Sequence, residues 1–184
     1  GCHDIIISDI TGRTGDDIVA LTAIARDDKV HPGGALCTTH VMHNDWSRRD
    51  RDIHDVIIRN VLGYSGGGIC FHVRLLPVES KIYNIVIDGI VDSSPDGFTD
   101  GGALLLGEGD GGYGVNLKEG MKNVTISNVI SKSRNCVIVG GYLKDSVITN
   151  VVNRNPDCGP FSVHREDGMV NVLTSNIFSA EKEK

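Results

Sequence analysis

Two adjacent carboxylates, Asp16 and Asp17, are the first candidates for chemistry in this 184-residue chain. They follow Gly15 and directly precede an apolar run that begins at Ile18. Two carboxyl groups held this close resist ionising together, so the pKa of one is expected to rise. The protonated carboxyl can then act as a general acid while the ionised one acts as a base. The competing interpretation is that the pair forms a solvated turn or a local cap.

A second group of candidates lies at the ends of two apolar runs, 69–73 and 103–106. Strand alternation places His72 and Arg74 on the face opposite to their apolar neighbours, so both are expected to point outward. His72 could exchange a proton, and Arg74 could hold a carboxylate or a hydroxyl. Glu108 and Asp110 are expected to extend the same column. The alternative is an exposed polar set with no chemical role.

The elements that must position these residues form an internal repeat. Six times, a short run of β-branched residues ends in a small polar marker residue followed by Ile or Val. The markers are Asp9, Asn60, Gly89, Asn128, Asn150 and Asn176, at intervals of 51, 29, 39, 22 and 26 residues. The shortest interval fits one coil of a β-helix, and the longer ones fit coils with loop insertions. A second apolar run follows five of the markers, at 18–21, 69–73, 103–106, 136–139 and 161–164.

The marker residues suit tight corners, because Asn and Gly tolerate a left-handed backbone. Asn128 and Asn150 are therefore expected to stack at one corner of neighbouring coils. An antiparallel sandwich is the competing fold, but it would require two-residue hairpin turns between its strands. The repeat predicts an all-β, right-handed parallel β-helix of about five to six coils. Residues 1–184 form one predicted domain, with a loop insertion at about 25–54.

The first coil carries a family resemblance. Residues 5–21, with Gly15-Asp16-Asp17 between two strand-like runs, resemble the polygalacturonases of glycoside hydrolase family 28, in the pectin-lyase-like superfamily. Those enzymes place a Gly-Asp-Asp triplet at a β-helix corner, before the strand that forms the floor of the substrate groove. The resemblance implies a glycoside hydrolase that acts on a polysaccharide lying along the stacked strands.

The chain also departs from that family. The family has a further aspartate on the preceding coil, which would lie before residue 1. It offers Gly-His-Gly where Gly66-Gly67-Gly68 stands here, and an Arg and a Lys where the run 103–108 reads Ala-Leu-Leu-Leu-Gly-Glu. Pectin specificity is therefore not implied.

The insertion at 25–54 holds Trp46, the only tryptophan. Loops of this length in a compact fold are usually functional or disordered. Trp46 is expected either to stack on a sugar ring or to attach the loop to the body of the protein. Cys37, His40, His43 and Asp45 have a spacing that a metal could use. Nothing else in the sequence supports a zinc site, so neither a metal nor a cofactor is predicted.

Composition excludes two classes of partner. The net charge is −6 and no basic stripe occurs, which argues against nucleic acid. No apolar run reaches the roughly 18 residues of a membrane span. A polyanionic substrate would be repelled at long range and would need local positive groups.

The sequence thus predicts a carbohydrate-active enzyme, secreted or at the cell surface, with Asp16, Asp17 and His72 as catalytic residues. Arg74, Trp46, Glu108 and Asp110 are the predicted substrate-binding residues. One alternative is a non-catalytic β-helix module for glycan binding or surface attachment. The other is a polysaccharide lyase or epimerase.

The chain starts directly in a strand-like run at 4–7, with no lead-in. Such a start leaves a sheet edge unpaired, which promotes association. Either a missing N-terminal segment or a second copy in a homo-oligomer is expected to cover this first coil.

Overall fold

The computed structural model describes residues 1–24, 51–66, 69–98, 101–108 and 116–182. In these ranges the chain is all-β, and no helix among them is long and apolar enough to span a membrane. The longer strands are β1 (Cys2–Thr14), β3 (Ile53–Ser65), β5 (Ile82–Asp92), β7 (Met121–Ser131), β9 (Leu143–Asn153) and β11 (Met169–Ser179). The shorter ones are β2 (Val19–Ile24), β4 (Phe71–Val78), β6 (Gly102–Leu106), β8 (Asn135–Val139) and β10 (Gly159–Val163).

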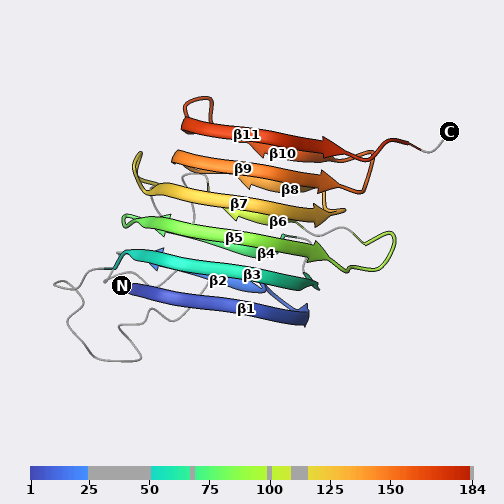
Figure 1. Cartoon of the computed structure of the whole chain (residues 1–184), viewed down its shortest axis with the longest axis horizontal. Coiled ribbons are helices and arrows are strands. Elements are labelled where there is room, and N and C mark those ends of the chain that lie inside the picture. Colours follow the sequence, from blue (N-terminus) through green and yellow to red (C-terminus); the bar gives the residue numbers. More distant parts are fainter. Residues whose placement is uncertain (25–50, 67–68, 99–100, 109–115, 183–184) are drawn as a thin grey trace.

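Successive strands alternate between two sheets. The odd-numbered strands form one sheet in the order β1-β3-β5-β7-β9-β11, and the even-numbered strands form the other in the order β10-β8-β6-β4-β2. Every described pair is parallel, and the chain rises from β1 to β11 as in a β-solenoid (Figure 1). We call an odd-numbered strand with the even-numbered strand after it a coil. The predicted parallel, repeating all-β architecture is confirmed, and the antiparallel sandwich is wrong.

Each odd-numbered strand bends twice at residues with a left-handed backbone. One column of such residues consists of the six predicted markers, all at positive φ, and five of them are Asp or Asn. Asn150 Nδ2 donates to Asn128 Oδ1 at 3.2 Å, and Asn176 Nδ2 donates to Asn150 Oδ1 at 3.0 Å. The predicted stacking of Asn128 on Asn150 is therefore confirmed. A second left-handed column, five residues earlier in each strand, was not predicted; it contains Asp4, Asp55, Asn84, Asn123, Asp145 and Asn171.

These two bends set the pattern of buried residues. In β7 the buried positions are Met121, Val124, Ile126, Val129 and Ser131, spaced by three, two, three and two residues. Each left-handed residue adds one position to the usual two-residue alternation of a strand. The side chains on both sides of a bend can therefore point into one interior. Burial of each large aliphatic side chain there contributes roughly 1.5–3 kcal/mol.

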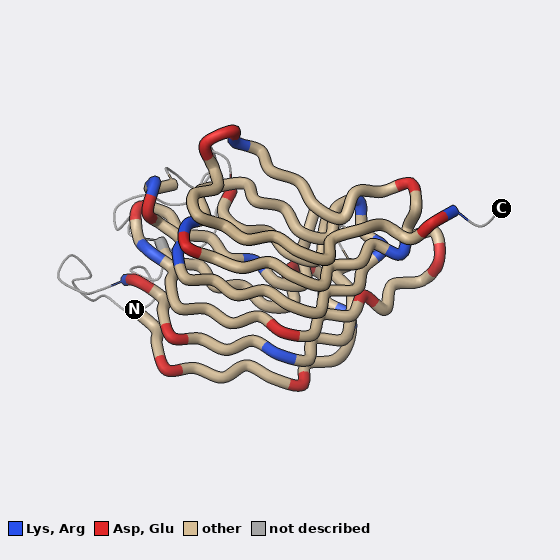
Figure 2. Tube along the Cα trace, turned by 45° about the horizontal axis from the view of Figure 1, so that its top comes forward, with Lys and Arg blue, Asp and Glu red and all other residues tan. Residues whose placement is uncertain are grey.

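The core lies between the two sheets. Three aliphatic positions of each central odd-numbered strand face two of each even-numbered strand, and all are almost completely buried. Examples are Val56, Ile58, Val61, Val73, Leu75, Ile85, Ile87, Ile90, Leu104 and Leu106. Charged residues gather mostly at the bends and connections, while the strands are largely uncharged (Figure 2). Chemistry is therefore expected at the corners between the sheets.

Candidate functional site

The corner between β1 and β2 brings Asp17 against the next coil. Asp17 Oδ1 accepts a hydrogen bond from the Phe71 N–H at 2.8 Å, and Asp17 Oδ2 lies 3.4 Å from Arg74 Nη1. The Asp17 side chain is only 7% exposed. Asp16 is exposed, and its Oδ1 accepts the Asp17 N–H at 2.8 Å. The two aspartates are thus held in different environments, one enclosed and one open to solvent.

Arg74 links this corner to the third coil. Its position in β4 lies in register between Ala20 of β2 and Leu105 of β6, on the outward side of the even-numbered sheet. Arg74 Nη2 donates to Glu108 Oε2 at 3.1 Å, just past the end of β6. The guanidinium therefore lies between the carboxylates of Asp17 and Glu108. Four predicted site residues from three successive coils meet here.

A thiol lies beside the two aspartates. Single ligand atoms of Asp16, Asp17 and Cys70 all lie within 4.8 Å of one another. Burial, together with the negative charges of the two aspartates, raises the pKa of the Cys70 thiol. A neutral thiol is a poor metal ligand, since cysteine binds metals as the thiolate. These three donors alone therefore do not define a metal site.

The prediction that His72 points outward is wrong. Its side chain is fully buried, and its Nε2 donates to the Gly63 carbonyl oxygen at 2.8 Å. Ala103 and Cys136, at the equivalent positions of the next two coils, are also fully buried. The column formed by His72, Ala103 and Cys136 is therefore buried near the corner, and His72 is part of the packed interior. It cannot reach a polymer on the outer face.

The remaining predicted residues fall outside the described ranges. Trp46 and Asp110 lie in the segments 25–50 and 109–115, as do Cys37, His40, His43 and Asp45. Their predicted roles stay predictions.

The structure also shows a pocket of about 390 Å³ that sequence reasoning missed. Asp96, Gly97, Phe98, Lys132, Arg154, Asn155 and Pro156 line it. A signal was present: Lys132 and Arg154 each stand four residues after a marker, Asn128 and Asn150. The same offset selects Arg13 and Tyr64, whose Cα atoms pair between β1 and β3. The repeat therefore places these side chains in one row along the corner.

Comparison with protein-family models, curated proteins and solved structures found no match.

Proposed function

We propose that the chain is a right-handed parallel β-helix of about five to six coils that binds a polysaccharide along its even-numbered sheet and hydrolyses it. Right-handed coiling is the expected hand, because parallel strands joined by crossovers almost always connect that way. The observation that carries the functional proposal is the meeting of Asp16, Asp17, Arg74 and Glu108 from three successive coils. A polymer that crosses the coils would contact the more exposed Asp16 and Glu108 and would pass over Arg74 and the enclosed Asp17.

The two aspartates have different roles in this proposal. Both oxygens of Asp17 face donors, the Phe71 N–H and the Arg74 guanidinium, which suits an ionised carboxylate that stabilises developing positive charge. Asp16 is exposed, so it can exchange a proton with the glycosidic oxygen or with a water molecule. Arg74 holds Asp17 and Glu108 in place, and Glu108 lies at the open side of the cluster.

The test is a screen of neutral and acidic polysaccharides for released reducing ends. Asp16→Asn is expected to lower turnover by 10²- to 10⁴-fold, the usual effect of removing a general acid or base. Its melting temperature should stay close to that of the parent, because an exposed carboxylate adds little to stability. Asp17→Asn should lower both turnover and stability, since it weakens a nearly buried ion pair. Asp167→Asn, on the turn before β11, is the matched control. Unchanged turnover in Asp16→Asn would contradict the assignment.

A non-catalytic glycan-binding module is the second candidate. It is favoured by the burial of His72 and by the pairing of Arg74 with two carboxylates, which leaves fewer groups for proton transfer. The same pairing argues against a lyase or epimerase that uses Arg74 as its base. Glycan binding without any released reducing ends would support the binding module and contradict the hydrolase.

A further inference from the structure

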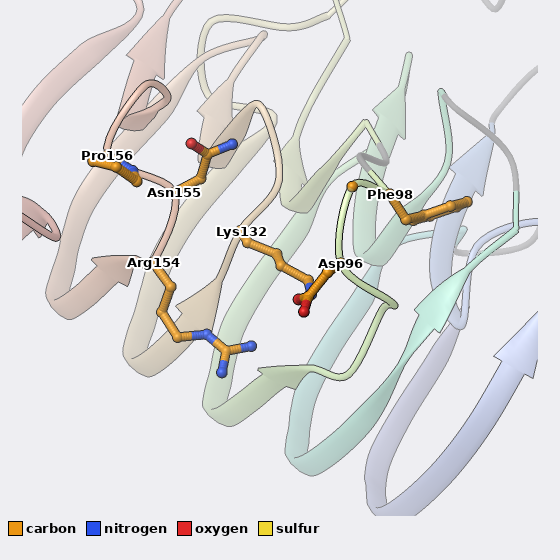
Figure 3. Close-up of a pocket in the computed structure, with 7 residues that line it drawn as sticks. Asp96, Phe98, Lys132, Arg154, Asn155 and Pro156 are labelled. Atoms are coloured by element: carbon orange, nitrogen blue, oxygen red, sulfur yellow. The ribbon is translucent and has the colours of Figure 1, made fainter. Parts of the chain in front are cut away.

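The pocket missed by sequence reasoning is built by three successive corners. Asp96, Gly97 and Phe98 belong to the connection after β5, Lys132 follows β7, and Arg154 to Pro156 follow β9 (Figure 3). Ser131 and Asn153, the residues before Lys132 and Arg154, are paired in register. The two cationic residues therefore hold equivalent positions on neighbouring coils, about 4.8 Å apart along the sheet.

Positive charge exceeds negative charge in this pocket. Lys132 Nζ contacts Asp96 Oδ1 at 3.0 Å; the lysine side chain is 17% exposed, whereas Asp96 is fully exposed. Arg154 is exposed and donates from Nη2 to the Asp92 carbonyl oxygen at 2.9 Å. Within the described residues Arg154 makes no ion pair. In Figure 3 its guanidinium extends toward the hollow where Lys132 meets Asp96. Two cations thus face one fully exposed carboxylate.

Two apolar residues lie at opposite ends of the pocket. Phe98 and Pro156 both line the pocket. Phe98 packs edge-on against Tyr64 with ring centroids 5.5 Å apart, and the Arg13 guanidinium lies 5.7 Å from the Tyr64 ring. This contact holds the Phe98 ring on the side of the pocket that faces β3, whereas Pro156 lies at the opposite end (Figure 3). The chain carries a net charge of −6, so an anion would be drawn here only by local cations.

We propose that this pocket binds a small organic anion of the size and chemistry of one acidic sugar. Its carboxylate is held by Arg154 and Lys132, and its ring lies in the hollow between Phe98 and Pro156. Arginine and lysine form strong charge-assisted hydrogen bonds with carboxylates, and pockets of about 300–1,000 Å³ hold small ligands. The anion takes the place of Asp96 beside Lys132. This site is separate from the Asp16–Asp17 corner and does not depend on the proposed hydrolysis.

The experiment is calorimetric and NMR titration of the full chain at low salt with D-glucuronate, with D-glucose as the neutral probe and inorganic sulfate as the anion without a ring. Glucuronate is expected to bind more tightly than both. Arg154→Gln and Lys132→Gln should each weaken glucuronate binding about tenfold, the effect of losing one charge-assisted hydrogen bond. Asp96→Asn should strengthen binding several-fold, because it removes the competing carboxylate.

Arg134→Gln is the matched control, since Arg134 is exposed, lies in the same turn as Lys132 and does not line the pocket. Asp16→Asn should leave glucuronate binding unchanged, so this proposal and the proposed hydrolysis can fail separately. If Arg154→Gln does not fold, Lys132→Gln and Asp96→Asn still test the site. Tighter binding of a uronate trisaccharide would identify a polymer as the source of the ligand. Tighter binding of glucuronate would identify the free acid as the ligand. Either result supports the site. No binding, equal binding of sulfate, or binding unaffected by the Lys132 and Asp96 variants would overturn the proposal.

Discussion

At the scale of single residues, the buried corner around Asp92 shows how the interior accommodates a charge. Asp92 Oδ1 accepts the Ser94 N–H at 2.8 Å, and Oδ2 accepts the Lys132 N–H and the Ser131 hydroxyl, each at 3.1 Å. His72 Nε2 lies 3.9 Å from Oδ1. Burial by itself raises the pKa of Asp92. The hydrogen bonds from Ser94 and Lys132, with the charge of His72, outweigh burial and hold this pKa below its usual value.

Stability should therefore depend on pH through Asp92. A carboxyl group whose pKa is lower in the folded than in the unfolded chain stabilises the fold above the unfolded pKa of about 3.9. This stabilisation is lost as the pH falls through the lower, folded pKa. Asp92→Asn should lower the free energy of unfolding by about 1–3 kcal/mol at pH 7, the cost of disturbing a buried hydrogen-bonded acceptor. The gap between parent and variant should shrink below about pH 4.

Urea denaturation at pH 7, 5 and 3 measures this gap. Asp167→Asn, which changes an exposed carboxylate, serves as the control. An Asp92→Asn deficit that stays constant over the whole range would show that the carboxylate's ionisation does not stabilise the fold.

At the same scale, the sequence could predict that Asp17 and Arg74 lie near each other on one face, but not their ion pair and not the place of His72. The nearness of Asp17 and Arg74 required only that the corner with Asp17 and the strand with Arg74 lie one coil apart on the same face of the solenoid. The prediction for His72 failed because strand alternation only assigns a side chain to one face of the strand, whereas its burial depends on which other residues cover that face. The backbone carbonyl of Gly63, nine residues before His72, and the carboxylate of Asp92, on the next odd-numbered strand, lie against His72.

At the scale of the elements, the left-handed columns hold neighbouring odd-numbered strands in register. Asn150 combines a φ of 54° with a donated and an accepted side-chain hydrogen bond to the adjacent coils. The sequence predicted this column because its marker recurs in every repeat. The second column is divided equally between Asp and Asn, and it follows no apolar run of constant form. It could therefore be recognised only once the register was known.

Substitutions at Asn150 should separate the contribution of its side-chain hydrogen bonds from that of its left-handed backbone conformation. Asn150→Ala loses the hydrogen bonds and also strains a left-handed position, so it should lower the free energy of unfolding by about 2–3 kcal/mol. Asn150→Gly loses only the hydrogen bonds and should cost about 1 kcal/mol. Gly89 stands at the equivalent place in β5 with a φ of 78°, which shows that glycine fits there. Chemical denaturation of both variants gives the comparison, and equal losses would mean that backbone strain contributes nothing.

At the scale of the whole molecule, the solenoid leaves apolar surface uncovered by any described residue. The outer side of the odd-numbered sheet carries two columns of exposed apolar side chains, one including Ile6, Ile57, Val86 and Leu173, the other Leu62, Val91, Ile130 and Phe178. Among the described strands, β1 pairs only with β3 and β11 only with β9 in this sheet. The repeat predicted such open edges, because parallel coils stack without closing. It could not predict the apolar columns, because their positions depend on the bends in each strand.

This surface leads to a prediction about association. Ile6 is 63% exposed and lies on the edge strand β1, whereas Ile57, its register partner on β3, is 38% exposed and lies one strand inside the sheet. If copies pair edge to edge, Ile6→Lys should reduce the concentration-dependent rise in sedimentation coefficient, because a charge on an edge strand opposes pairing with another strand. Ile57→Lys should leave that rise nearly unchanged, since β3 is already paired on both sides. Sedimentation velocity at several protein concentrations compares the two variants with the parent chain. An equal reduction in both would place the contact on the apolar column instead of the edge, and a parent chain that stays monomeric at every concentration would show that the bare edge does not drive association.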